Sequence, residues 1–159
     1  MIQFSPADAF EFAVRIEENG EKFYRTMAEK FSENDMIKEL FCHLADEEVK
    51  HKGIYSQFLG KVAVPLETAN YPEEYFAYMQ AYVERVIFTP ERLEAEIKRI
   101  DDIEDALDFA IRTELENILY FEELKKFLKR NQQGQVDKII SEERKHFLEL
   151  SVMKKKYKL

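Results

Sequence analysis

The sequence predicts an all-α fold: a four-helix bundle whose two halves are joined by a long crossover connection that contains extra helix. Apolar residues recur at steps of three and four over four long segments, which is the spacing of a helix face buried in a bundle. The 159 residues include only 4 Gly and 4 Pro, so long helices can run uninterrupted. The second half of the chain also repeats the helical pattern of the first. We expect one domain over residues 1–159, with a helical hairpin at 5–60, the crossover at 61–102 and a second hairpin at 103–157.

The first helix is expected to begin at Ser5 and Pro6, because Ser caps helix N-termini and Pro is favoured at the first helical position. A break follows at residues 32–35, where the sequence reads SEND. The outward face is charged. The inward stripe consists of Phe10, Ala13, Glu17, Gly20, Tyr24, Ala28 and Phe31.

The second helix has the most regular stripe, with steps of four and three alternating along its whole length, as in a bundle seam. We expect it to end near Gly60. Its stripe consists of Ile37, Phe41, Leu44, Glu48, His51, Tyr55 and Phe58.

The crossover is expected to contain two helical stretches. The first is rich in aromatic residues, and its run from Tyr75 to Tyr82 suits either a cover over the bundle or, as we favour, a contact between subunits. The second is a short helix capped at Thr89, with Pro90 at its first position. A connection of this length indicates a crossover rather than a tight hairpin.

The third helix is expected to begin between Asp101 and Asp105, and the fourth to follow a turn with the sequence RNQQGQ. Both continue the pattern of the first two. The third stripe consists of Ile103, Leu107, Ala110, Glu114, Asn117, Phe121, Leu124 and Leu128. The fourth consists of Val136, Ile139, Ile140, Glu143, His146, Phe147, Leu150 and Met153.

The overall charge and the cysteine content exclude several classes of function. The net charge of −8 argues against nucleic acids or anionic membranes as partners, because their phosphates would be repelled. Cys42 is the only cysteine, which excludes an internal disulfide and a cysteine-based zinc site. We read it as a packed thiol. The sequence shows no signal peptide and no apolar stretch long enough to span a bilayer, so we expect a cytoplasmic location.

Every helix interrupts its apolar stripe at one level with acidic or imidazole side chains. Buried carboxylates repel one another and cost several kcal/mol unless they are protonated or bridged by cations. Two divalent metal ions would be held by four carboxylates and two imidazoles, and Glu-x-x-His places both donors on one helix face. A metal-free bundle with protonated or solvated acids is the alternative. The candidate ligands are Glu17, Glu48, His51, Glu114, Glu143 and His146.

Helix phase separates these glutamates from their neighbours, since Glu18, Glu47 and Glu142 each fall one step off the stripe. The pattern is also duplicated. The motif at Glu48 and His51 recurs 95 residues later, and Glu17 recurs 97 residues later as Glu114. The duplication makes a chance arrangement of acids a weaker explanation than a metal site.

The segments IEENGEKFY, DEEVKH, AIRTELENILYF and SEERKH resemble the di-iron domain of the rubrerythrin branch of the ferritin-like superfamily. The resemblance implies two iron ions per chain, bound by the six candidate ligands. It also implies that Glu48 and Glu114 are the bridging pair and that Tyr24 lies beside the metals. The same oxygen and nitrogen donors accept manganese or a mixed pair of metals.

The chain departs from this family in two places. It has no Cys-x-x-Cys pair, so we expect it to lack the rubredoxin domain of full rubrerythrins and to receive electrons from a separate donor such as a rubredoxin-type protein. Asn117 stands where rubrerythrins carry an additional glutamate ligand. The resemblance then implies that His51 stays on the metal throughout the redox cycle.

The resemblance favours an oxidoreductase that reduces hydrogen peroxide, or that oxidises Fe(II) with peroxide or dioxygen, with Glu48 and Glu114 at the reacting centre. An iron-binding or storage protein without turnover, and a metal-free helical interaction module, are the alternatives. We also expect a homodimer or a higher homo-oligomer.

Overall fold

The computed structural model describes residues 8–61 and 72–157, which contain helices and no strand. The all-α prediction is therefore confirmed for the described part of the chain. A short 3-10 turn, η2 (Arg130–Gln132), precedes the last helix. The α-helices are α1 (Ala9–Lys30), α2 (Asp35–Lys61), α3 (Glu73–Val86), α4 (Pro90–Lys98), α5 (Ile103–Lys125) and α6 (Gln133–Tyr157).

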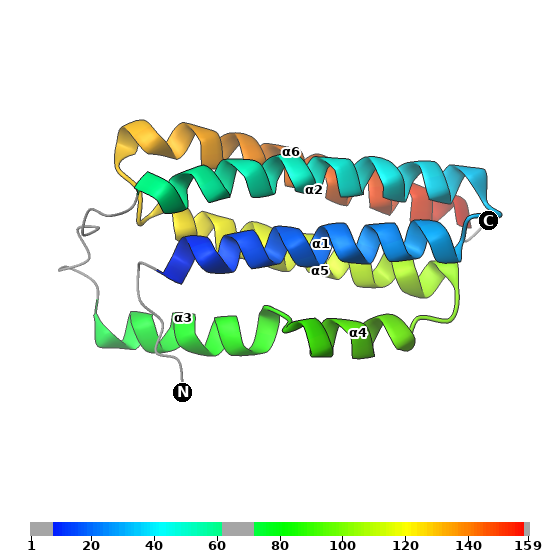
Figure 1. Cartoon of the computed structure of the whole chain (residues 1–159), viewed down its shortest axis with the longest axis horizontal. Coiled ribbons are helices and arrows are strands. Elements are labelled where there is room, and N and C mark those ends of the chain that lie inside the picture. The colour runs from blue at the N-terminus through cyan, green and yellow to red at the C-terminus, as the bar shows by residue number, and fades with distance from the viewer. Residues whose placement is uncertain (1–7, 62–71, 158–159) are drawn as a thin grey trace.

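The helices form two antiparallel hairpins, α1–α2 and α5–α6, which pack side by side into a four-helix bundle (Figure 1). The helices α3 and α4 follow one another along the outside of the bundle (Figure 1). The crossover is long because α2 ends at one end of the bundle and α5 begins at the other. The predicted bundle with helix in its crossover is thus the observed architecture.

Side-chain caps mark the breaks between the helices. Asn34 Oδ1 accepts a hydrogen bond from the backbone N–H of Ile37 at 3.1 Å, at the break predicted from SEND. Thr89 caps α4 as predicted, and Asp102 Oδ1 accepts from the N–H of Asp105 at 2.8 Å at the start of α5.

For two helices, the observed start differs from the predicted one or the predicted start lies outside the described part of the chain. The start expected at Ser5 and Pro6 lies outside the described residues. The start of α6 falls inside the predicted turn, because Gln133 and Gly134 are already helical. The side chain of Gln133 donates hydrogen bonds to the carbonyl oxygens of Lys125 and Leu128, which satisfies acceptors at the end of the preceding helix.

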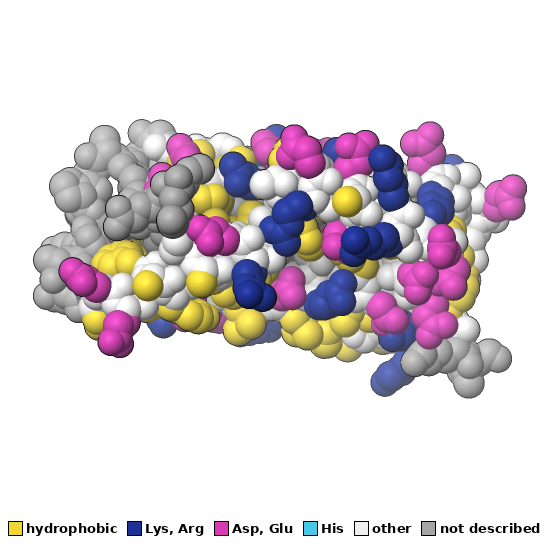
Figure 2. Space-filling view, turned by 90° about the horizontal axis from the view of Figure 1, so that it is seen from below, with side chains coloured by type: hydrophobic (Ala, Val, Ile, Leu, Met, Phe, Trp, Pro, Cys, Tyr) yellow, Lys and Arg dark blue, Asp and Glu magenta, His cyan; other side chains and the backbone are white. Residues whose placement is uncertain are grey.

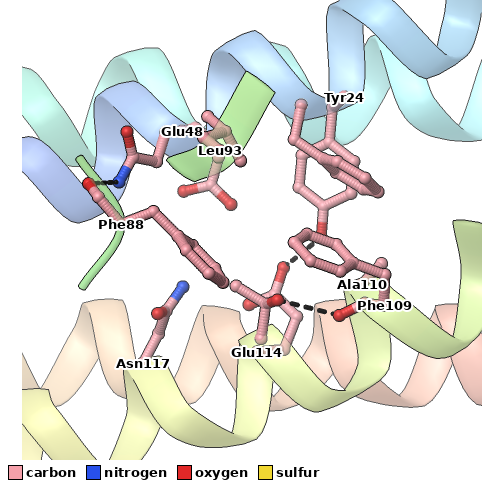
Figure 3. Close-up of a pocket in the computed structure, with 12 residues that line it drawn as sticks. Tyr24, Glu48, Phe88, Leu93, Phe109, Ala110, Glu114 and Asn117 are labelled. Carbon is pink, nitrogen blue, oxygen red and sulfur yellow. Dashed lines mark hydrogen bonds between the residues drawn. The ribbon is translucent and has the colours of Figure 1, made fainter. Parts of the chain in front are cut away.

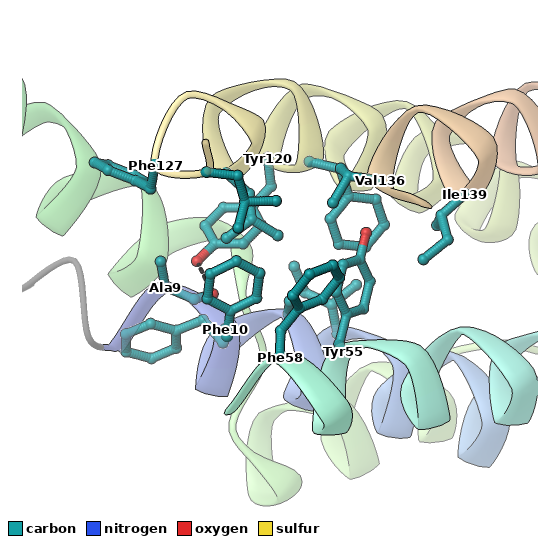
Figure 4. Close-up of a cluster of buried hydrophobic side chains, with 14 of the residues drawn as sticks. Ala9, Phe10, Tyr55, Phe58, Tyr120, Phe127, Val136 and Ile139 are labelled. Atoms are coloured by element: carbon teal, nitrogen blue, oxygen red, sulfur yellow. Dashed lines mark hydrogen bonds between the residues drawn. The ribbon is translucent and has the colours of Figure 1, made fainter. Parts of the chain in front are cut away.

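The apolar core consists of two clusters, one toward each end of the bundle. The first is rich in aromatic residues and includes Phe10, Tyr55 and Phe58 (Figure 4). The second includes Met27 and Phe41. On each of the four bundle helices, the buried glutamates and histidines lie in the sequence between residues of the two clusters. The polar side chains therefore occupy one layer with apolar packing on both sides.

The aromatic run in α3 mainly covers the bundle. Met79 is fully buried, and Tyr75 donates a hydrogen bond to Glu123 on α5 at 2.6 Å. Tyr82 donates to the carbonyl oxygen of Glu116 and stacks on Tyr120. Of the tyrosines in this run only Tyr78 is more than half exposed. Most of these residues therefore act as a cover over the bundle. No helix in the described part of the chain has the length and apolar character needed to cross a membrane.

Candidate metal centre

The structure brings all six candidate ligands into one buried layer of the bundle. Each of these residues is at most 2% exposed, which is exceptional for ionisable residues. The i,i+3 spacing within α2 and within α6 turns each glutamate and its histidine to the same face. The layer is built from Glu17 on α1, Glu48 and His51 on α2, Glu114 on α5, and Glu143 and His146 on α6.

Glu143 lies between the two imidazoles. Its Oε1 is 2.7 Å from Nδ1 of His51, and its Oε2 is 3.1 Å from Nδ1 of His146. The two rings lie nearly parallel, with an interplanar angle of 21° and centroids 5.7 Å apart. Both histidines thus turn their Nδ1 atom toward Glu143 at the centre of the layer.

The other three carboxylates surround this core. The Nδ1 atom of His51 is 3.7 Å from Oε2 of Glu17 and 3.8 Å from Oε2 of Glu48, and Nδ1 of His146 is 3.7 Å from Oε1 of Glu114. The six residues fall into two groups of four, and the ligand atoms of each group lie within 4.8 Å of one another. One group is Glu17, Glu48, His51 and Glu143, and the other is Glu48, Glu114, Glu143 and His146.

The membership of these groups differs from the expected bridging pair. Glu48 belongs to both groups, as a bridging ligand should, but its companion in both is Glu143 rather than Glu114. The reason is geometric: Glu143 lies between the two histidines, whereas Glu114 approaches only His146.

Several oxygens in the layer have no hydrogen-bond partner among the described residues. These are both carboxylate oxygens of Glu17 and Oε2 of Glu114. A buried polar atom without a partner costs about 1–3 kcal/mol, and more when it is charged. A cation placed among these oxygens would supply the missing interaction. The donor set of carboxylate oxygens and imidazole nitrogens also suits iron or manganese.

The electrostatics of the layer show how protons balance its charge in the absence of metal. Burial raises the pKa of Glu17 and Glu48 well above the usual value, and burial together with the charge of Glu143 raises the pKa of Glu114 to about 8. Burial alone would raise the pKa of Glu143 too, but its contacts with Glu114 and both histidines hold that pKa well below its usual range. Three of the four acids therefore favour their protonated form.

The pKa values of the two histidines are raised, whereas the pKa of an ordinary buried imidazole is lowered. Burial lowers their pKa, but hydrogen bonds to carboxylates outweigh it and raise the pKa of His51 to about 9 and of His146 to about 11. The metal-free layer thus holds protons that bound cations would displace.

Tyr24 lies where the resemblance implied, beside the carboxylates. Its hydroxyl donates a hydrogen bond to Oε1 of Glu114 at 2.5 Å. Burial and the charge of Glu114 raise its pKa well above the usual value, so the phenol stays protonated. Tyr120 has no such role, because its hydroxyl donates to the carbonyl oxygen of Ala9 at 2.7 Å. Tyr55 is a buried phenol whose hydroxyl has no partner among the described residues.

A pocket reaches the carboxylate layer between α1, α5 and the junction of α3 and α4 (Figure 3). Its inner wall includes Glu48, Tyr24 and Glu114, and the side chain of Asn117 also lines it. Asn19 ties the junction to α1 by donating a hydrogen bond to the carbonyl oxygen of Phe88 at 2.9 Å. The remaining walls are mostly apolar, so the pocket presents a small, largely uncharged space next to the glutamates.

Glu142 contributes to the site although helix phase placed it off the stripe. Its Oε2 is 2.7 Å from Nε2 of His51, on the opposite side of the ring from Glu143. A carboxylate on the outer nitrogen of a metal-binding histidine fixes the tautomer and the ring orientation. No sequence signal distinguished this glutamate, since the contact crosses from α6 to α2.

We therefore expect Glu142→Ala to weaken metal binding about 10- to 100-fold, because His51 loses the acceptor that orients it. Titration of the metal-free protein with a divalent cation measures this change. Glu149→Ala on the same helix, which removes a half-exposed carboxylate near His43, is the control and should leave the affinity unchanged. Equal affinities for the two variants would disprove the positioning role.

Gly20 leaves space for Glu48. A Cβ atom built on Gly20 would lie 3.0 Å from Cδ and 3.2 Å from Oε1 of the Glu48 side chain. Glycine inside a helix costs about 0.5–1 kcal/mol relative to alanine, so this close approach offers a reason for its presence in α1. The sequence placed Gly20 on the inward stripe without showing which side chain it faces.

Gly20→Ala is expected to displace the Glu48 carboxylate and to weaken metal binding about 10-fold, which is within the range for a disturbed ligand shell. Gly53→Ala is the matched control, because a Cβ there would meet nothing within 4 Å. The control should stabilise the protein by about 0.5–1 kcal/mol and leave metal binding intact. Thermal unfolding and metal titration of both variants test this, and an unchanged metal affinity in Gly20→Ala would contradict it.

Comparisons with known proteins agree with the fold and with the chemistry of this layer. The family model described as Rubrerythrin matches residues 8–104, which is more than half of the chain. Among solved structures, the chain is similar to a Thermotoga maritima protein proposed to be a ferritin-like diiron-carboxylate protein. The two share 28% identity with a TM-score of 0.74, over 98% of this chain and 97% of that one. No match was found among curated proteins.

Proposed function

Because the chain belongs to the rubrerythrin family, we propose that it is a di-iron carboxylate oxidoreductase that reduces hydrogen peroxide. The observation that carries the proposal is the position of Glu143 between two buried histidines, in both of two adjoining four-ligand groups. This arrangement suits a pair of metal ions that share ligands, rather than one ion.

Each residue then has a distinct part in holding the metals. Glu48 and Glu143 are proposed to bridge the two ions, since only they belong to both groups. Glu17 and His51 would complete the ligands of one ion. Glu114 and His146 would complete the ligands of the other. His51 is proposed as a permanent ligand, because Asn117 offers no carboxylate to exchange with it.

When bound, a pair of ferrous ions would supply the two electrons that, with two protons, reduce one hydrogen peroxide molecule to two water molecules. The protein's own groups would manage the protons and the approach of the substrate. Tyr24 holds a proton on its hydroxyl, which donates a hydrogen bond to Oε1 of Glu114 within the carboxylate layer. The pocket beside Glu48 and Asn117 is the proposed route for a small uncharged oxidant (Figure 3).

Electrons are proposed to come from a separate donor such as a rubredoxin-type protein. Iron is the proposed metal because the similar solved structure is described as a proposed ferritin-like diiron-carboxylate protein, although the same ligands accept manganese.

Stopped-flow oxidation of the iron-loaded, reduced protein tests the proposal. Hydrogen peroxide is expected to oxidise the centre faster than dioxygen does, and Asn117→Leu is expected to slow the peroxide reaction by narrowing the pocket. If peroxide reacts no faster than dioxygen, the peroxidase proposal loses its support. Rapid oxidation by dioxygen with release of Fe(III) would favour the alternative of Fe(II) oxidation, and bound iron without turnover would favour storage.

A further inference from the structure

A series of aromatic rings in contact runs from the buried carboxylate layer to the surface of α3. In order from the layer outward, it consists of Tyr55, Phe121, Tyr120, Tyr82, Tyr78 and Tyr75. We call these six residues the aromatic chain. The centroids of successive rings are 5.0, 6.2, 6.0, 6.3 and 6.4 Å apart, which is the spacing of packed ring pairs. Figure 4 labels two of its buried members, one on α2 and one on α5.

The inner end of the aromatic chain adjoins the candidate metal ligands. Tyr55 follows His51 on α2 by four residues, a rise of about 6 Å along the helix, so both side chains lie on the same face. Tyr55 is fully buried, and burial and the charges of Glu17 and Glu143 raise its pKa well above the usual value. The first ring is therefore about one helical turn from the layer.

The outer end of the aromatic chain reaches solvent on α3. Tyr78 is 52% exposed, whereas Tyr55 and Tyr120 are buried. Figure 2 views the molecule from the side on which α3 and α4 lie, and hydrophobic side chains, tyrosine among them, reach the surface over α3. A small molecule in solution can therefore contact the outer rings, while the inner rings contact only protein.

Tyr75 differs from the other tyrosines of the aromatic chain in its hydrogen bond. Its hydroxyl donates to Oε2 of Glu123 at 2.6 Å, and Nζ of Lys126 donates to the same oxygen at 2.9 Å. The hydroxyls of Tyr82 and Tyr120 donate instead to backbone carbonyl oxygens, which do not take up a proton. A phenol that loses an electron becomes a very strong acid, so a phenol beside a carboxylate gives up its electron more readily. Tyr75 is thus the member of the chain that is easiest to oxidise.

We propose that Tyr75, together with Glu123, is a one-electron oxidation site that the aromatic chain connects to the candidate metal centre. Electron tunnelling weakens exponentially with distance, so a series of rings in contact carries electrons far better than an aliphatic core of the same length. The rings that lead away from Tyr24 offer no such site, because they run through Phe23 and Phe109 to Phe88 and contain no second phenol.

The site would complete a reaction for which the metal centre holds too few electrons, and this role rests on the proposed reduction of hydrogen peroxide. One peroxide molecule takes up two electrons and two protons to give two water molecules. When the centre holds only one electron, Tyr75 supplies the second: the electron passes inward along the aromatic chain, and the O–H proton passes to the Glu123 carboxylate. Both protons that peroxide consumes come from solvent. A one-electron reductant such as ascorbate then returns an electron to the Tyr75 oxygen, and Glu123 returns the proton.

Spin trapping tests the proposal on the full, iron-loaded chain that has been reduced by one electron per centre. Hydrogen peroxide is added with a nitroso spin trap, EPR detects the tyrosyl radical, and mass spectrometry of the peptides locates the trapped residue. We expect the label on Tyr75. Glu123→Gln removes the proton acceptor and Tyr120→Phe removes a phenol from the path, so each should lose most of that label. Tyr157→Phe, at a partly exposed tyrosine of α6 outside the aromatic chain, is the control and should keep it. Unchanged helicity and iron content show that each variant is folded.

A measurement on the metal-free protein separates this proposal from the proposed function. Azide radicals from pulse radiolysis oxidise tyrosines directly, and the label should again collect on Tyr75 and be lost in Glu123→Gln. Label spread over the exposed tyrosines would overturn the oxidation site, whatever peroxide does. Iron that peroxide oxidises while Tyr75 stays unlabelled would overturn the connection to the centre and leave the peroxide reaction standing. If peroxide does not oxidise the iron, the proposed function fails, and the metal-free protein alone decides whether Tyr75 is the oxidation site.

Discussion

Replacing Glu143 with alanine is expected to remove both metal ions from the protein, whereas Glu17→Ala and Glu114→Ala are each expected to remove one. The difference follows from the membership of the two ligand groups. Glu143 belongs to both, Glu17 only to the group with His51, and Glu114 only to the group with His146. Elemental analysis after iron loading and desalting measures the number of ions retained by each variant.

Glu143→Ala should also destabilise the metal-free protein by about 3–5 kcal/mol, because two protonated buried imidazoles lose the carboxylate between them. Glu17 differs, since neither of its oxygens has a partner among the described residues. Its removal should cost the metal-free protein little. Glu18→Ala, one residue away and exposed, is the control and should retain both ions. If all three buried glutamates behave alike, the division into two groups is wrong.

The stability of the metal-free protein is expected to fall as pH rises from about 5 to about 9. Glu114 has a folded pKa of about 8 against an unfolded value of about 4.3, so between these values only the folded state holds its proton. Stability then decreases with pH by up to about 1.4 kcal/mol per unit for each such group. Glu17 and Glu48, whose pKa values are also raised, act in the same direction.

The histidines add to this decline. Their raised folded pKa values, about 9 for His51 and about 11 for His146, contribute stability that is complete below about pH 6.5 and is lost as pH rises through those values. Glu143 has a lowered pKa and therefore contributes stability above about pH 4.3, which is lost only on acidification. The metal-free protein should accordingly be most stable near pH 5.

Bound metal should reverse the trend, because metal ions displace the protons and bind more tightly as pH rises. Urea unfolding between pH 5 and 9, with chelator and then with saturating metal, measures both curves. Glu17→Met removes one of the acids with a raised pKa, so it should flatten the metal-free curve and stabilise that form at pH 8 by about 1–4 kcal/mol. A metal-free stability that increases with pH over this range would contradict the account of the buried layer.

The fold could be predicted from the sequence because its periodicity is local and strong. All seven members of the α2 stripe, from Ile37 to Phe58, are buried in the structure. The same periodicity separated Glu17 from Glu18 and Glu48 from Glu47, so the residues of the buried layer could be named in advance. Helix phase indicates which side chains point inward, and the repeat in the second hairpin gives the same indication independently.

The features that could not be predicted from the sequence are contacts between different helices. Helix phase placed Glu142 off the stripe, yet its side chain reaches across to His51. The resemblance implied Glu114 on α5 as the companion of Glu48, whereas the two ligand groups share Glu48 and Glu143, because Glu143 lies between the two histidines. The aromatic run of α3 was ambiguous for the same reason, because exposed and packed tyrosines have the same sequence signature.

The six buried side chains of this layer are proposed to hold two metal ions in one chain. Iron loading of the full-length protein, followed by elemental analysis and anomalous scattering from its crystals, tests this directly. We expect two iron ions per chain, with Glu48 and Glu143 contacting both and the Nδ1 atom of each histidine bound to a different ion. Fewer than one ion per chain, or a loaded site from which His51 points away, would contradict it.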